Sequence, residues 1–147
     1  SRNSEIVSNL DFAQTFLDIA GVKSPDDMQG GSLVPLFKGH VPKHWRTHFY
    51  YHYYEFPGAH SVARHYGVTN GRHKLIHFYQ NNEWELFDLK KDPNELQSVY
   101  GNSDYKTIQS DLLAELKRLR VHYKVPEEDP VPPKRKRPNQ PNRPKKK

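Results

Sequence analysis

The 147-residue sequence contains no cysteine, which excludes disulfides, thiolate metal sites and a cysteine nucleophile. It has no apolar run near the length of about 20 residues that a membrane-spanning helix needs, so we expect no membrane partner. It also lacks a signal-peptide pattern and opens at Ser1 rather than at methionine. We therefore expect that processing or truncation has removed an upstream segment.

Aromatic residues are missing from the end of the chain. Residues 126–147 contain 7 of the 12 prolines and no aromatic residue, and their 8 Lys and Arg against 3 Asp and Glu give a net charge of +5. Such a composition predicts a disordered basic tail. Residues 1–125 carry only +1, which does not indicate a nucleic-acid partner, and their length suits one modest domain.

What is present is a stretch of aromatic and β-branched residues from Thr47 to Leu89, which is typical of strands. The breaks at Pro, Gly and Asn predict three or four antiparallel strands. Asn70-Gly71 marks a tight hairpin turn. The expected strands are Thr47–Tyr54, Ser61–Thr69, His73–Tyr79 and Glu83–Asp88.

Helices are predicted on both sides of this sheet. Before it, Ser8 resembles an N-cap and Gly21 a C-cap for a helix with apolar residues on both faces. We expect this helix to be buried on more than one side, with protein outside this sequence packing against it. Between that helix and the sheet, Ser32–Lys38 predicts one helical turn. After the sheet, one apolar stripe predicts a helix lying across it: Ile108, Leu112, Leu116, Leu119 and Tyr123. The expected fold class is α+β, a small antiparallel sheet of three to four strands packed with a C-terminal helix.

The chain has nine histidines, and His40, His44, His48 and His52 recur every four residues. This spacing would suit a metal site on a helix, but Pro42 and the aromatic run that follows favour loop and strand. No third ligand falls at a standard zinc spacing. We therefore prefer partly exposed or hydrogen-bonded strand histidines and assign no metal ligand.

The most informative local group is the bend Glu55-Phe56-Pro57-Gly58-Ala59-His60 and the residues after it. Arg and His beside aromatic residues suit an anionic, ring-shaped ligand such as a sulfated sugar, because Arg offers a bidentate fork. On a strand, residues 60, 62 and 64 share a face, so His60 and Arg64 are the candidate substrate-binding residues and His65 is structural. The alternative is a surface ion pair between Arg64 and Glu55.

Four blocks carry a family resemblance: VSNLDFAQTFLDIAG, MQGGSLVPLFKG, WRTHFYYHYYEFPGAHSVARHYGVTNGRHKLIHFY and EWELFDLKKDPNELQSVYG. In this order they resemble the C-terminal region of a bacterial sulfatase of the N-sulphoglucosamine sulfohydrolase and arylsulfatase branch. The resemblance covers about residues 6–125. The chain departs from the family at Gln14, where Pro is frequent, and at Ser98, where Asn is common, and neither position carries chemistry.

The resemblance implies an alkaline-phosphatase-like α/β hydrolase of which residues 1–125 are the C-terminal subdomain. Such enzymes convert the Cys or Ser of C/S-x-P-x-R to formylglycine and hold a calcium ion. This sequence contains neither that motif nor the calcium-binding carboxylates, so we expect no catalytic residue in it and no activity from it alone. The resemblance further implies a sulfated carbohydrate substrate, a substrate-side position for His60 and a periplasmic or extracellular location.

Two other interpretations remain open. The basic tail alone would make the chain a polyanion-binding module, although such tails are usually solvated extensions. The histidine count alone would make it a metal-binding domain. Only the sulfatase interpretation explains the two-faced first helix and the four blocks together.

Overall fold

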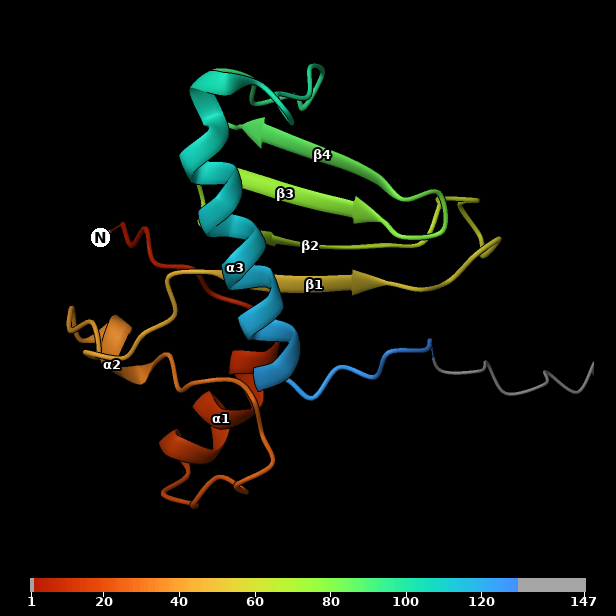
Figure 1. The fold of residues 1–147 in the computed structure, drawn as a ribbon. Coiled ribbons are helices and arrows are strands. Elements are labelled where there is room, and N and C mark those ends of the chain that lie inside the picture. The colour runs from red at the N-terminus through yellow and green to blue at the C-terminus, as the bar shows by residue number, and fades with distance from the viewer. Residues whose placement is uncertain (1, 130–147) are drawn as a thin grey trace, which may run out of the picture.

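The chain builds two short N-terminal helices, a four-stranded sheet and a long C-terminal helix (Figure 1). The computed structural model describes residues 2–129. The elements in chain order are α1 Leu10–Ile19, α2 Val34–Phe37, β1 Phe49–Tyr53, β2 His65–Thr69, β3 His73–Phe78, β4 Glu83–Asp88, the 3-10 turn η1 Ser103–Tyr105 and α3 Lys106–His122.

The sheet is an antiparallel meander in the order β1-β2-β3-β4. The Asn70-Gly71 turn joins β2 to β3 as predicted: Gly71 has a φ of +87°, and the Asn70 side chain accepts a hydrogen bond from the backbone N–H of His73 at 2.7 Å. All four predicted strands are present, but β2 begins at His65 rather than at Ser61. Residues 54–64 therefore form a longer loop than the sequence indicated.

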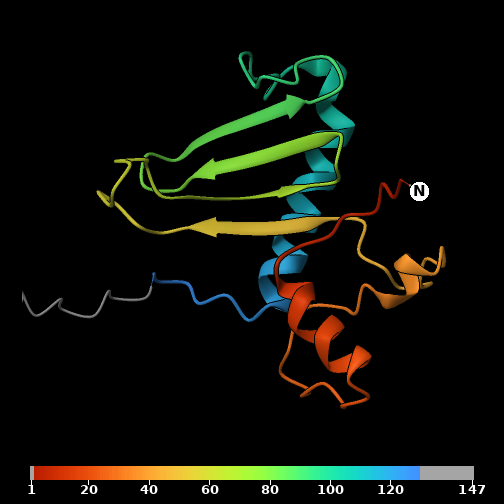
Figure 2. The ribbon, with the colours of Figure 1, turned by 180° about the vertical axis from the view of Figure 1, so that it is seen from behind.

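Helix α3 crosses one face of the sheet, in front of the strands in Figure 1 and behind them in Figure 2. Its predicted stripe supplies Leu112, Leu116 and Leu119 to the core, where they pack against one row of the sheet. That row is Val68, Leu75 and Leu86, each with 0% exposure. Burying each of these side chains contributes roughly 1.5–3 kcal/mol. The predicted α+β class, with the helix across the sheet, is confirmed.

Helix α1 buries a polar face against the rest of this chain. Its buried residues are Asp11, Gln14 and Thr15. The apolar residues Phe12, Phe16 and Ile19 are 54%, 68% and 67% exposed, so nothing within the described residues covers them. That further protein buries this helix on more than one side stays a prediction. The polar face is anchored within the chain: the Thr15 hydroxyl accepts a hydrogen bond from the N–H of Leu33 at 2.9 Å, and the Asp11 carboxylate accepts one from Gly31 at the same distance.

The segment between α1 and β1 packs closely on α1. A Cβ atom at Gly30 would lie 2.1 Å from the carbonyl oxygen of Leu10, so only glycine fits there. The predicted helical turn forms as α2, with Leu33 and Leu36 buried and Phe37 exposed. Glycines 30 and 31 thus serve the contact with α1.

Candidate functional site

The candidate site lies where the loop of residues 54–64 leaves β1. Within this loop the N–H of Ser61 donates to the carbonyl oxygen of Pro57 at 2.8 Å and closes a turn. Gly58 has a φ of +42°, and a Cβ there would lie 2.6 Å from the carbonyl oxygen of Glu55. Glycine is therefore required at the bend, which fixes the course of the loop toward His60.

His60 is exposed in the turn and lies outside the strands. The expectation that residues 60, 62 and 64 share one strand face is wrong, because the backbone between 61 and 64 pairs with no neighbouring strand and Ser61 has a φ of +51°. Strand alternation thus cannot be used to place His60 and Arg64 on the same side.

Arg64 lies in a cluster of polar groups and not beside Glu55. Its Nη1 atom donates to Oδ2 of Asp129 at 3.0 Å, and its Nη2 atom donates to the carbonyl oxygen of Phe56 at 3.5 Å. The Tyr79 hydroxyl donates to the same Asp129 oxygen at 2.7 Å, and Nε2 of His52 lies 3.4 Å from Oδ1. Asp129 therefore accepts hydrogen bonds from the loop and from the residue after β3, with an imidazole of β1 close by.

The surroundings set the protonation of this cluster. Burial lowers the pKa of His52, and Asp129 only partly opposes the effect. Burial together with the hydrogen bond to Asp129 raises the pKa of the Tyr79 hydroxyl far above its usual range. At neutral pH, Tyr79 is therefore a protonated donor toward the carboxylate, and His52 is neutral.

His65 lies on the other face of the sheet and is packed among aromatic rings. Its ring stacks on Tyr53 with centroids 5.5 Å apart, and its Nδ1 atom lies 2.8 Å from the carbonyl oxygen of Ala63. This placement supports a structural role for His65.

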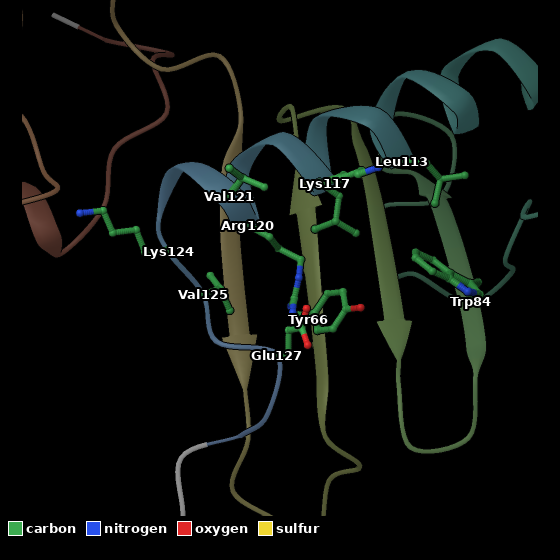
Figure 3. Close-up of a pocket in the computed structure, with 10 residues that line it drawn as sticks. Tyr66, Trp84, Leu113, Lys117, Arg120, Val121, Lys124, Val125 and Glu127 are labelled. Atoms are coloured by element: carbon green, nitrogen blue, oxygen red, sulfur yellow. The ribbon is translucent and has the colours of Figure 1, made fainter.

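A hollow of about 430 Å³ lies beside the cluster, between the C-terminal half of α3, the sheet and the segment that follows α3 (Figure 3). Its floor includes Tyr66 and Trp84, and the Arg120 guanidinium lies 4.1 Å from the centre of the Tyr66 ring. Lys117 adds a second cation and Glu127 an anion. Aromatic and cationic groups together suit an anionic ring-shaped ligand.

Several of these residues were missed by sequence reasoning. Tyr79 and Arg120 carried no local signal. In the sequence, His52 stood out only through the histidine spacing. The pairing of β1 with β2 places it opposite Tyr66. Asp129 lies beyond the boundary predicted at residue 125 and contacts Arg64 and Tyr79, which flank β2 and β3. The remainder of the predicted tail, 130–147, lies outside the described residues.

The strand histidines have individual partners. His48 lies 3.7 Å from Glu115, His73 lies 3.7 Å from Asp88, and His77 stacks on Trp84 with centroids 3.8 Å apart. Within residues 2–129 no three His, Cys, Asp or Glu side chains gather as a metal site would require. In the same range no helix has both the length and the apolar character needed to cross a bilayer.

Comparison with known proteins identifies the family. The family model described as N-sulphoglucosamine sulphohydrolase, C-terminal, matches residues 1–122. The chain belongs to this family. The predicted resemblance to the C-terminal region of a sulfatase is thereby confirmed.

Relatives of this sulphohydrolase C-terminal region are sulfatases. It is 47% identical over 127 residues to an N-acetylglucosamine-6-O-sulfatase of Bacteroides thetaiotaomicron, covering 84% of the chain and 23% of the relative. It is 33% identical over 105 residues to an arylsulfatase of Clostridium perfringens, covering 69% of the chain and 20% of that protein. The chain thus spans about a quarter or less of the length of these relatives.

A solved structure supports the same assignment. It is that of a protein in complex with its substrate D-glucosamine-2-N,6-O-disulfate, and it superimposes with a TM-score of 0.76 at 46% identity. The match covers 80% of this sulphohydrolase C-terminal region and 24% of the other chain. The fold described above is therefore the fold of a sulfatase C-terminal subdomain.

Proposed function

We propose that the chain is the C-terminal part of a sulfatase that hydrolyses a sulfate ester or N-sulfate of a sulfated amino sugar. The observation that carries this proposal is the 46% identity and TM-score of 0.76 to a protein in complex with a disulfated glucosamine. The N-acetylglucosamine-6-O-sulfatase relative points to the same class of sugar. The catalytic core would then lie in a part of the protein outside this chain.

Within this function, the loop of residues 54–64 forms part of the substrate wall. The exposed His60 imidazole hydrogen-bonds a sugar hydroxyl when neutral, or the sulfate when protonated. Arg64 has five N–H donors, of which Asp129 and Phe56 engage two, so its outer nitrogens retain donors for an anionic group. The Arg64 guanidinium and a protonated His60 both favour a sulfated sugar over a neutral one.

Formylglycine and calcium, which sulfatases of this kind use, do not fit the residues present. The sequence has no cysteine and no Ser-x-Pro-x-Arg, and residues 2–129 hold no group of acidic side chains suited to a metal. Both would be supplied by the remainder of the protein. This chain's contribution is to bind and orient the sugar.

We also infer a periplasmic or extracellular location, which cell fractionation of the source organism would test.

The deciding experiment assays the full-length protein that contains this chain against glucosamine 6-sulfate, glucosamine N,6-disulfate and a hexuronate 2-sulfate. We expect sulfate release from the glucosamine substrates and at least tenfold less from the uronate, with none from residues 1–147 alone. Release from none of the sugars, or an upstream sequence without C/S-x-P-x-R, would remove the proposal.

A further inference from the structure

The segment that follows α3 returns toward the sheet. The last residue of the described part of the chain, Asp129, has a carboxylate that is hydrogen-bonded to other parts of the fold. Lys124, Val125 and Glu127 line one side of the hollow in Figure 3. Asp129 then reaches Arg64, Tyr79 and His52. Its side chain is only 17% exposed, whereas its neighbours Glu127 and Glu128 are exposed. Asp129 therefore differs from the other acidic residues of this segment, because its side chain is largely buried and hydrogen-bonded.

Arg64 connects this carboxylate to the candidate substrate loop. One guanidinium nitrogen donates to Asp129 and the other lies at 3.5 Å from the carbonyl oxygen of Phe56. Phe56 precedes the bend that the Ser61–Pro57 hydrogen bond closes around His60. A continuous path of polar contacts thus runs from Asp129 through Arg64 to the backbone beside His60.

We propose that Asp129 is a positioning residue that holds Arg64, and through it the loop of residues 54–64, in the arrangement that receives the sulfated sugar. This inference rests on the proposed function. Without the carboxylate, the long Arg64 side chain regains rotamer freedom, and both its own donors and the Phe56 contact lose their fixed place. Asp129 acts through Arg64 and does not itself touch the substrate.

The cluster favours positioning over competition with the substrate. A carboxylate that only blocked an anion site would need one strong partner, but Asp129 accepts hydrogen bonds from both Arg64 and Tyr79, and the His52 imidazole lies 3.4 Å away. Tyr79 remains protonated because its pKa is raised, so its 2.7 Å hydrogen bond persists at neutral pH. These contacts keep Asp129 in place while Arg64 retains other donors for the ligand.

The test compares Asp129→Asn with Glu128→Gln in the full-length protein. The two variants remove the same charge one residue apart, and only the first removes the Arg64 pair. We expect Asp129→Asn to raise KM for glucosamine N,6-disulfate about tenfold with kcat changed less than about threefold, and Glu128→Gln to change neither. Asp129→Glu should restore part of the loss. Trypsin cleavage after Arg64 should quicken in Asp129→Asn alone.

Several outcomes would overturn the inference. They are a KM unchanged from the Glu128→Gln control, a KM that falls because the carboxylate competes with the substrate, and a lowered Tm with an unchanged KM. The double variant Arg64→Ala/Asp129→Asn must cost no more than Arg64→Ala alone, because both act through one contact. If His60→Ala and Arg64→Ala leave kcat/KM intact, the proposed loop function itself fails. If they impair it and Asp129→Asn does not, only the positioning role fails.

Discussion

Arg46 and Asp11 form a two-pronged ion pair that joins the segment before β1 to the first turn of α1. Both guanidinium Nη atoms donate to the carboxylate, one of them at 2.6 Å, and Asp11 has 0% exposure. The N–H groups of Ser8 and Gly31 donate to the same carboxylate. Two elements far apart in the sequence are thus held by one buried anion.

Removing Arg46 should destabilise the fold. Arg46→Ala leaves the Asp11 charge buried without its partner, so we expect the free energy of unfolding to fall by about 3 kcal/mol, the lower end for a buried pair because Arg46 keeps 18% exposure. Arg46→Lys should recover only part, since an ammonium lacks the fork. Urea unfolding measures the loss. Lys23→Ala, which removes an exposed pair with Asp26, is the control and should change nothing measurable.

Stability should depend on pH in two stages. Burial lowers the folded-state pKa of His52, His73 and His77, so the unfolded state binds more protons below about pH 6.5 and stability falls there as pH decreases. Hydrogen bonds from Arg72 hold the pKa of Asp88 well below its usual range, so this carboxylate stabilises the fold above about pH 4 and its contribution is lost on further acidification. Melting temperatures between pH 3 and 8 test both stages.

The control for the acid stage is Asp88→Asn, which should weaken the decline below pH 4. The contributions of His52 and His77 should be unchanged, whereas loss of the Asp88 charge lowers the pKa of the neighbouring His73 further and deepens its part of the histidine stage. A melting temperature that rises on acidification from pH 7 to 5 would contradict the lowered histidine pKa values.

The exposed face of α1 should behave differently in the short and the long protein. In residues 1–147 alone, the double substitution Phe16→Ser and Ile19→Ser removes exposed apolar surface, so we expect less self-association with stability retained. In the full-length protein the same change should lower the melting temperature, because we expect the remainder of the protein to cover this face. Light scattering and thermal melting measure the two effects.

Val121→Ser is the matched control, since Val121 is 73% exposed and belongs to α3 rather than to α1. The expectation fails if the α1 variant leaves the full-length protein as stable as Val121→Ser does.

His60 and His65 should separate function from stability. In the full-length protein, His60→Ala should lower kcat/KM for the sulfated sugar more than tenfold, a loss above about 1.4 kcal/mol, with the melting temperature retained because the side chain is exposed. His65→Ala should lower the melting temperature, because it removes the ring that stacks on Tyr53. A kcat/KM within twofold of the parent for His60→Ala would make the bend purely structural.

Truncation should separate the basic tail from the segment that contacts the sheet. Deleting residues 130–147 removes all eight Lys and Arg of the tail, so salt-sensitive retention on heparin should fall while the melting temperature holds. Deleting residues 126–147 also removes Asp129 and should in addition impair substrate binding. Equal behaviour of the two truncations in the KM assay would contradict a role for residues 126–129.

The sequence alone determined the sheet, the long helix and the family. Aromatic and β-branched runs broken by Asn70-Gly71 specify strands and their turn, and the stripe of leucines specifies the helix face that covers them, because both signals come from local geometry and from burial. It also singled out the bend at Pro57-Gly58, where glycine is needed for a close backbone approach.

Tertiary structure alone decided how the candidate site is assembled. The partner of Arg64 is 65 residues away in Asp129, the donor Tyr79 is 50 residues from that carboxylate, and the buried face of α1 is polar because Asp11 and Thr15 bind distant backbone groups. Such contacts depend on which segments the fold brings together and carry no local periodicity. From the sequence alone, a charged side chain is predicted to lie on the surface. Only the folded chain supplies the donors that allow it to be buried.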